Sequence, residues 1–338
     1  MIETEEQLEE ALSRPPKGLG EELAALGGDL VVLGVGGKMG PSLARMARRA
    51  LDAAGSRAQV FGAARFSNPA AREALERWGV RPLRADLLER DDVRRLPDAA
   101  AVVFMAGMKF GSTGAEAETW ATNAYLPGLV AERYPRARTV VFSTGNVYPF
   151  VTPESGGATE ETPPGPVGEY AQSALGRERV FEYFSRRRGT PTAVFRLNYA
   201  VELRYGILLE IARKVHEGIP IDVRTGYVNV IWQADANATA LRCLAAADSP
   251  PSVWNVTGPE ILSVRDLARK FGALLGRDPV FEGREEPTAL LSNPARAVAR
   301  FGRPTPVESI LPWVAHWVRI GGRTLHKPTH FETRDGKF

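Results

Sequence analysis

A glycine-rich loop between a short apolar run and a helical stretch restricts the fold of this chain more than any other feature. Gly34, Gly37 and Gly40 form a Gly-x-x-Gly-x-x-Gly pattern directly after residues 29–33 and before residues 41–53. Glycines allow a tight turn and let backbone N–H groups approach a phosphate, and the helix dipole favours negative charge there. An ordinary tight turn would give the same string. The strand and helix on either side favour a dinucleotide-binding loop.

Apolar runs and helical stretches alternate from residue 29 onward. The expected strands are residues 29–34, 59–64, 80–86, 100–106, 139–143 and 192–197. The expected helices between them are residues 41–53, 69–78, 115–134 and 170–187. Continuous apolar strands that alternate with helices predict an α/β fold with a doubly wound parallel sheet (Rossmann). Such sheets bind their ligands at the carboxyl ends of the strands.

The alternation ends near residue 198, and the rest of the chain predicts a smaller unit. We divide the sequence into an N-terminal helical extension (1–28), a dinucleotide-binding Rossmann domain (29–198), a C-terminal substrate-binding lobe interleaved with it (199–325), and a C-terminal tail (326–338). The tail is polar, and we expect its two histidines, His326 and His330, to be solvated.

Charge and cysteine content argue against several classes of protein. The net charge is only +3, and the basic residues are spread among acids, so we expect no nucleic-acid partner. The single cysteine, Cys243, cannot form a disulfide within the chain, and no Cys or His pair has metal-ligand spacing. The acidic N-terminus lacks an apolar run, so we expect no signal peptide, no membrane anchor and a cytoplasmic location.

Three motifs together resemble the extended short-chain dehydrogenase/reductase family, in its sugar epimerase/dehydratase branch. They are the glycine loop, Phe142-Ser-Thr-Gly-Asn-Val-Tyr148 after the fifth expected strand, and Gly168-Glu-Tyr-Ala-Gln-Ser-Ala on the next helix. The segment Ala121-Thr-Asn-Ala-Tyr-Leu is similar to that family's Asn-bearing helix. The resemblance spans about residues 29–320.

The resemblance implies roles for Thr144 and Tyr170. Thr144 would orient the reacting oxygen, and Tyr170 would move a proton while a nicotinamide takes or gives hydride. A lysine four residues after the tyrosine, on the same helical face, lowers the phenol's pKa in that family, but this chain has Ala174 there. Arg177 lies one turn further on, and we expect it to be too distant. Lys109 is the candidate replacement, and a solvated loop lysine is the alternative.

The family also implies a set of cofactor-binding positions. They are Gly34, Gly37, Lys38, Met39, Gly40, Arg65, Ser67, Asp86, Leu87, Ala106, Gly107, Asn123 and Tyr170. NAD sites place Asp or Glu after the second strand to bind the ribose hydroxyls. Here Arg65 and Ser67 stand there instead, and they suit a 2′-phosphate unless they are ordinary surface residues. We therefore expect NADP rather than NAD.

Two departures from the family's sequence pattern narrow the range of reactions and substrates that we expect. Dehydratases carry an Asp-Glu pair after the catalytic Thr, but this chain has Gly145 and Asn146, so loss of water is not expected. Val228 stands where nucleotide-sugar enzymes often have Arg, which leaves diphosphate recognition open. Arg196, Arg204 and Arg224 are the alternatives for that role. The substrate-binding candidates are Asn146, Asn198 and Arg204.

The sequence favours an NAD(P)-dependent oxidoreductase or epimerase acting on a sugar, sugar-acid or polyol derivative. A degenerate dinucleotide-binding relative, acting as a sensor or scaffold without redox chemistry, is the alternative. A third possibility is an enzyme that keeps its dinucleotide tightly bound. Relatives pair through two long helices that correspond to residues 115–134 and 170–187. We therefore expect a homodimer with Val180, Phe181 and Phe184 in its seam, although packing on the chain's own sheet would explain them equally well.

Overall fold

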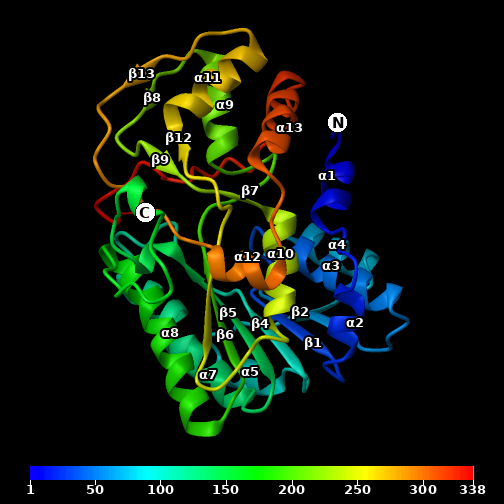
Figure 1. Cartoon of the computed structure of the whole chain (residues 1–338). Helices are drawn as coiled ribbons and strands as arrows, with labels where there is room; N and C mark the ends of the chain where they lie inside the picture. The colour runs from blue at the N-terminus through cyan, green and yellow to red at the C-terminus, as the bar shows by residue number, and fades with distance from the viewer. Residues whose placement is uncertain (338) are drawn as a thin grey trace.

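A computed structural model describes residues 1–337 of the chain, and its centre is a seven-stranded sheet (Figure 1). The strand order is β11-β6-β5-β4-β1-β2-β3, and every neighbouring pair is parallel. The strands are β1 (Leu30–Leu33), β2 (Val60–Ala64), β3 (Arg81–Arg84), β4 (Ala101–Phe104), β5 (Arg138–Thr144), β6 (Thr192–Leu197) and β11 (Ser252–Val256). The doubly wound parallel sheet that the sequence predicts is confirmed.

Helices cover both faces of this sheet because its strands are apolar on both sides. Leu30 and Val32 pack with α3 (Gly40–Ala53), whereas Val31 and Leu33 pack on the opposite face with α7 (Leu126–Arg133). Successive side chains of a strand point to opposite faces, so a continuous apolar run is buried on both. The other helices of this domain are α4 (Pro69–Arg77), α5 (Arg90–Arg95), α8 (Gly168–Arg188), α10 (Gln233–Cys243) and α12 (Ala295–Phe301).

The helix expected at 115–134 is interrupted. It consists of α6 (Glu116–Trp120), a π-helical turn η1 (Ala121–Tyr125) and α7. Pro127 has no N–H to bond the carbonyl of Asn123, four residues earlier, and this favours a wider turn at that point. The wide turn lies beside α8 and carries the buried Asn123.

A second hydrophobic core lies in the lobe, which Figure 1 shows above the carboxyl edge of the sheet. It is built on α9 (Ile207–Glu217), α11 (Val264–Leu275) and α13 (Val307–Arg319). Three pairs of two-residue strands complete it: β7 (Ala200–Val201) with β10 (Ile231–Trp232), β9 (Tyr227–Val228) with β12 (Leu262–Ser263), and β8 (Ile221–Asp222) with β13 (Phe281–Glu282). Strand β11 returns to the main sheet after much of this lobe, so the two units share the chain.

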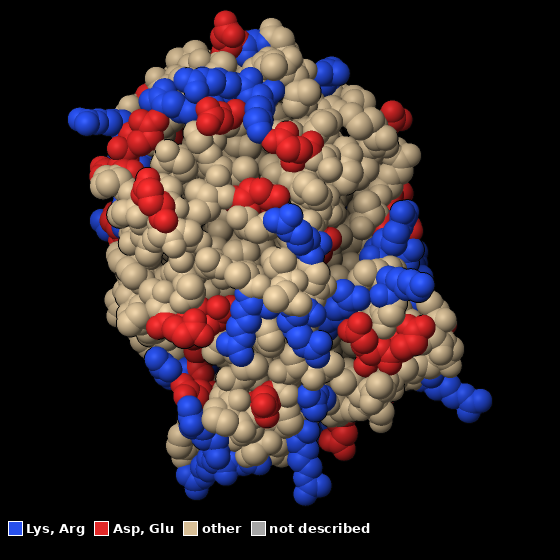
Figure 2. All heavy atoms as spheres, viewed as in Figure 1, with Lys and Arg blue, Asp and Glu red and all other residues tan. Residues whose placement is uncertain are grey.

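The N-terminal extension contributes to both cores. Helix α1 (Glu5–Leu12) buries Leu8 and Leu12 in the lobe, whereas α2 (Leu19–Ala24) packs on α3 of the Rossmann domain. On the face seen in Figure 2, acidic and basic side chains are interspersed. Among the described helices, none is long and apolar enough to cross a bilayer.

The C-terminal tail folds back between the lobe and the sheet domain (Figure 1). The Leu325 N–H donates to the carbonyl of Arg204 at 2.9 Å, and Phe331 is buried in the lobe core. Arg334 donates to the carbonyl and hydroxyl oxygens of Thr288 at 2.6 and 2.7 Å. His326 is exposed as expected, whereas His330 is half-buried with its ring 6.1 Å from the Phe110 ring. The tail as a whole is packed in place, which its polar sequence did not indicate.

Candidate active site

The three glycines of the loop have different structural roles. A Cβ on Gly34 would lie 2.6 Å from the backbone nitrogen of Ala106, and one on Gly40 would lie 2.2 Å from the carbonyl oxygen of Val35. Gly34 also has a φ of +83°, a conformation that favours glycine. At Gly37 the nearest atom to such a Cβ is 3.4 Å away. The backbone at Gly37 is therefore open to a ligand, whereas the other two glycines allow the chain to pack.

Two adjoining cavities follow the carboxyl edge of the sheet, and both are lined by the glycine loop. One, of about 340 Å³, lies over β2 and β3. It is lined by Gly34, Gly37, Arg65, Ser67, Asp86, Leu87, Ala106 and Gly107 among others. The second, of about 380 Å³, lies under the lobe and contains Lys38, Met39, Gly40 and Tyr170 in its lining. An elongated dinucleotide fits this arrangement, since the glycine backbone stands where the two cavities meet.

Asn123 is the one expected cofactor residue outside both linings. Its side chain is fully buried, donates to the Met108 carbonyl and accepts from the Met108 N–H, each at 2.9 Å. It also donates to the Ser173 hydroxyl at 2.9 Å. Asn123 therefore fixes the loop after β4 against α8 rather than facing a cofactor.

Thr144 and Tyr170 meet in the larger cavity, as the sequence predicts for a catalytic pair. Thr144 ends β5, and its hydroxyl oxygen accepts hydrogen bonds from the backbone and side-chain nitrogens of Asn146, at 3.2 and 3.0 Å. Burial raises the pKa of Tyr170, and its hydrogen bond with Thr144 and the charge of Arg177 oppose that rise. The phenol is therefore protonated near neutral pH.

The charge of Arg177 acts on Tyr170, which helix spacing did not indicate. Its guanidinium is buried and donates to the Phe142 carbonyl at 2.7 Å and to Asn123 Oδ1 at 2.5 Å. Side chains on a helix point toward its N-terminus, so a long arginine reaches back over the turn that carries Tyr170. Arg177 was expected to be too distant to replace the lysine, but its charge lowers the pKa of Tyr170.

Ala174 does not leave an open space beside Tyr170. It is fully buried and packs with Val147, Tyr148 and Ala158 in a small apolar cluster. A lysine at this position would have to displace these side chains.

Lys109 enters the larger cavity from the loop after β4. Its amine lies 5.8 Å from the centre of the Tyr170 ring and donates to the Thr329 carbonyl at 3.4 Å. Burial lowers the pKa of Lys109 to about 8. This position does not fit the alternative of a solvated loop lysine.

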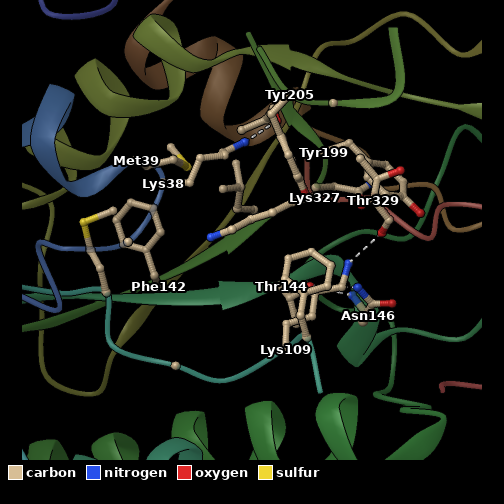
Figure 3. Close-up of a pocket in the computed structure, with 18 of the residues that line it drawn as sticks. Lys38, Met39, Lys109, Phe142, Thr144, Asn146, Tyr199, Tyr205, Lys327 and Thr329 are labelled. Atoms are coloured by element: carbon tan, nitrogen blue, oxygen red, sulfur yellow. Dashed lines mark hydrogen bonds between the residues drawn. The ribbon is translucent and has the colours of Figure 1, made fainter. Parts of the chain in front are cut away.

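Lys38 projects from the glycine loop toward the lobe (Figure 3). Its amine donates to the Ala200 carbonyl at 3.0 Å and lies 3.8 Å from the centre of the Tyr205 ring. Burial lowers its pKa to about 7, and the neighbouring charges of Lys109 and Lys327 act in the same direction. The sequence predicts that Lys38 binds the cofactor, but it does not indicate that the side chain faces the C-terminal lobe.

Of the three expected substrate-binding residues, two line the larger cavity and one does not. Asn146 and Asn198 line the larger cavity, although Asn198 also donates to Asn229 Oδ1 at 2.8 Å. Arg204 lies outside the lining and forms ion pairs with Glu9 at 2.8 Å and with Glu202 at 3.2 Å. The expected substrate role of Arg204 is not supported by this position, because its charge holds the N-terminal extension to the lobe.

The other two arginines considered for a diphosphate are also engaged elsewhere. Arg196 is buried and forms an ion pair with Glu178 at 2.7 Å, and exposed Arg224 pairs with Asp222 at 2.6 Å. Lys327 and Thr329, from the tail, line the cavity and were missed. Nothing in the sequence near them signals a site. Within residues 1–337, no group of three or more His, Cys, Asp or Glu side chains is placed to hold a metal ion.

Fold and cleft together define an α/β protein with a glycine-loop cleft and a Thr-Tyr pair under the C-terminal lobe. A family model described as "NAD dependent epimerase/dehydratase family" matches residues 30–226. The chain belongs to this family and is an epimerase-type enzyme that depends on a nicotinamide dinucleotide. Comparison with the curated proteins gave no match.

Solved structures of low sequence identity share the fold. MoeE5 in complex with UDP-glucose and NAD is 20% identical with a TM-score of 0.66, over 87% of this chain and 99% of that one. UDP-glucuronic acid 4-epimerase from Bacillus cereus, in complex with UDP-glucuronic acid and NAD, is 16% identical with a TM-score of 0.71, over 86% and 99%. UDP-glucose 4-epimerase from Thermotoga maritima, with UDP-glucose, is 17% identical with a TM-score of 0.69, over 86% and 98%.

Proposed function

We propose that this chain is an NADP-dependent oxidoreductase or epimerase acting on a sugar, sugar-acid or polyol derivative. The observation that carries the proposal is the buried Thr144–Tyr170 pair in a cavity that continues into the glycine-loop cleft. A pocket that combines a titratable phenol, a hydroxyl and a dinucleotide cradle suits the interconversion of an alcohol and a carbonyl.

Thr144 and Tyr170 have different roles at the substrate oxygen. Thr144, with Asn146 beside it, holds that oxygen next to the phenol. In oxidation, Tyr170 accepts the hydroxyl proton as the carbinol carbon loses hydride; in reduction, Tyr170 returns the proton to the forming alkoxide. A nicotinamide, when bound, accepts or returns the hydride. A protonated Tyr170 is ready for reduction at neutral pH, whereas oxidation requires its deprotonated form.

Two cations stand where they can stabilise the deprotonated form of Tyr170. The Arg177 guanidinium is buried in the protein interior, and the Lys109 amine lies in the cavity. The charge of Arg177 lowers the phenol's pKa, and we assign it the positioning and electrostatic role that Ala174 cannot fill. Lys109 remains the candidate on the substrate side.

The nucleotide pocket favours a 2′-phosphate. Arg65 and Ser67 follow β2 and share a hollow with Arg72 and Arg84. Arginine binds phosphate through several N–H donors, and no acid stands between Ala64 and Ser67 to repel it. We therefore propose NADP, although the solved relatives named above contain NAD.

Replacement of Tyr170 tests the function. Tyr170→Phe keeps the ring and removes the proton-transfer group, so we expect turnover to fall by about 10²–10⁴-fold. With a panel of sugars, sugar acids and their keto forms, NADPH absorbance measures net oxidation or reduction, and chromatographic separation of the epimers measures epimerisation. Tight nucleotide binding with no activity on the panel would favour the sensor or scaffold alternative. Nucleotide that is released only by denaturation would favour the tightly bound cofactor.

We also propose a homodimer built on α6, η1 and α8. Trp120, Tyr125 and Tyr183 are exposed on these elements. Phe181 does not belong to the seam, because it is buried against Phe104 at a ring distance of 5.2 Å. Light scattering at micromolar concentration measures the assembly, and a single chain would contradict the dimer.

A further inference from the structure

The C-terminal tail contributes side chains to the larger cavity. Lys327 and Thr329 line it together with the glycine loop. The backbone N–H and the hydroxyl of Thr329 donate to the carboxylate oxygens of Glu210, on α9, at 2.6 and 2.8 Å. Phe331, two residues further on, is buried in the lobe core. The segment 325–331, which we call the strap, is therefore fixed to the lobe, and Lys327 enters the cavity from this segment.

The Lys327 side chain extends toward the part of the cavity where the glycine loop enters. Figure 3 shows it reaching from the tail toward Phe142, with its amine on the side of Lys38 and Met39. Met39 directly precedes α3, the helix that begins at the glycine loop. Backbone N–H groups at a helix start, together with the helix dipole, favour an anion. Lys327 therefore adds a cation on the side of the cavity where we place the pyrophosphate of a dinucleotide.

The charges of Lys327 and Lys38 act on each other in a cavity without an acidic side chain. Burial lowers the pKa of Lys38 to about 7, and the charge of Lys327 acts in the same direction. No Asp or Glu lines this cavity in the part of the chain that the structure describes. An anion near both amines relieves their repulsion, so the pair suits a negatively charged ligand.

Both amines have hydrogen-bond donors to offer such a ligand. The Lys38 amine donates to the Ala200 carbonyl at 3.0 Å, which leaves its other N–H groups for a ligand. Lys327 is exposed, and within residues 1–337 its amine forms no hydrogen bond or ion pair. An exposed lysine side chain can also adjust to a ligand without any change in the core.

We propose that Lys327 and Lys38 together bind the pyrophosphate of the dinucleotide cofactor, so that the strap closes over the cofactor. This inference rests on the proposed function, because it requires a dinucleotide in the glycine-loop cleft. The glycine backbone and the start of α3 bind the pyrophosphate from the sheet domain, and Lys327 binds it from the strap. NAD and NADP share this group. Lys327 therefore contributes to the affinity for both, whereas Arg65 is expected to act on NADP alone.

The affinity for nucleotide should depend on pH through Lys38. A bound anion favours the protonated amine, so affinity should fall as pH rises from 6 to 9. NAD⁺ is the ligand for this series, because its phosphates stay ionised over that range. Lys38→Met should flatten the profile, and a profile identical to that of the wild type would contradict the role of Lys38. The groups whose charges act on Lys38 are Glu202, Lys109, Arg204 and Lys327, and its amine lies over the Tyr205 ring.

Calorimetric titration of the full chain with NAD⁺ and NADP⁺ tests the role of Lys327. The variant Lys327→Met should bind both nucleotides about tenfold more weakly than the wild type. Lys327→Arg keeps the charge and should retain most of the affinity. Lys337→Met is the matched control, because it removes another exposed lysine of the same tail, one that pairs with Asp335. This control should bind both nucleotides as the wild type does.

The proposal is wrong if Lys327→Met and Lys337→Met bind NAD⁺ equally tightly. Weaker binding of UDP alone, with NAD⁺ unchanged, would assign Lys327 to a substrate diphosphate and overturn the proposal. A loss for NADP⁺ alone would overturn it too, because Lys327 would then serve the 2′-phosphate. Wild-type protein that binds neither nucleotide would contradict both this inference and the proposed function. Nucleotide binding that depends on Lys327, without any turnover on the substrate panel, would support the strap and contradict the proposed function.

Discussion

The half of the cleft proposed for the nucleotide is formed by backbone and short loops at strand ends. The half proposed for the substrate is formed by side chains from distant parts of the chain. Gly34, Gly37 and Gly40 are neighbours in sequence. In the substrate half, Lys109 meets Thr329 across 220 residues. The first half depends on local geometry that a short motif encodes, and the second depends on how the tail and lobe pack. The two halves should therefore respond differently to substitution.

The largest effect is expected in the nucleotide half, at Gly37. Gly37→Asp places a carboxylate where the pyrophosphate is proposed to bind, and we expect nucleotide affinity to fall by more than about 100-fold. Gly37→Ala is the matched control, because a Cβ there meets nothing closer than 3.4 Å. Calorimetric titration with NADP⁺ and NAD⁺ measures both variants. If the Gly37→Asp variant binds both nucleotides with unchanged affinity, the glycine loop is not the nucleotide-binding site.

The next effect is expected where the two halves meet, at Arg177. Its charge lowers the pKa of Tyr170, so Arg177→Met should raise that pKa. Oxidation needs the deprotonated phenol, so its rise in rate with pH should move to higher pH, with about a tenfold loss at neutral pH. Reduction should be affected less, because its active form is the protonated phenol. The pH profile of kcat/KM from pH 6 to 10, in both directions, measures this.

Two further variants separate charge from packing at this position. Arg177→Lys keeps the charge and should recover part of the pH profile. Arg179→Met removes an exposed arginine of the same helix and should change nothing. Loss of the buried hydrogen bond to Phe142 should also lower the stability of Arg177→Met, by about 1–3 kcal/mol. A destabilised variant with an unmoved pH profile would make Arg177 a packing residue only.

The most selective effect, on one of the two nucleotides only, is expected at the nucleotide's outer end, at Arg65. A charge-assisted contact to phosphate contributes about 1.5–3 kcal/mol, so Arg65→Ala should weaken NADP⁺ by more than about tenfold and leave NAD⁺ nearly unchanged. Arg77→Ala, on α4, is the control, because Arg77 lies outside both cavity linings. Wild-type protein that binds NAD⁺ tenfold more tightly than NADP⁺ would contradict the preference.

The sequence by itself determined the sheet, the glycine loop and the Thr144–Tyr170 pair. Each depends on a short pattern: apolar runs that fit strands buried on both faces, glycines where a Cβ would clash, and polar residues at a strand end and in the first turn of a helix. Local periodicity and steric limits act over a few residues, so these features can be predicted from the sequence.

Tertiary structure alone decided which charges line the cleft and which of them act on Tyr170. Arg177 reaches it because the α8 side chain turns toward the helix N-terminus and finds acceptors on Phe142 and Asn123. Arg204, expected in the site, is instead held by acids of the N-terminal extension. Lys327 enters the cavity because Glu210, in a helix far from it in sequence, binds Thr329. Such contacts depend on how separate elements pack. The local sequence around a long charged side chain does not indicate which partner it will bind.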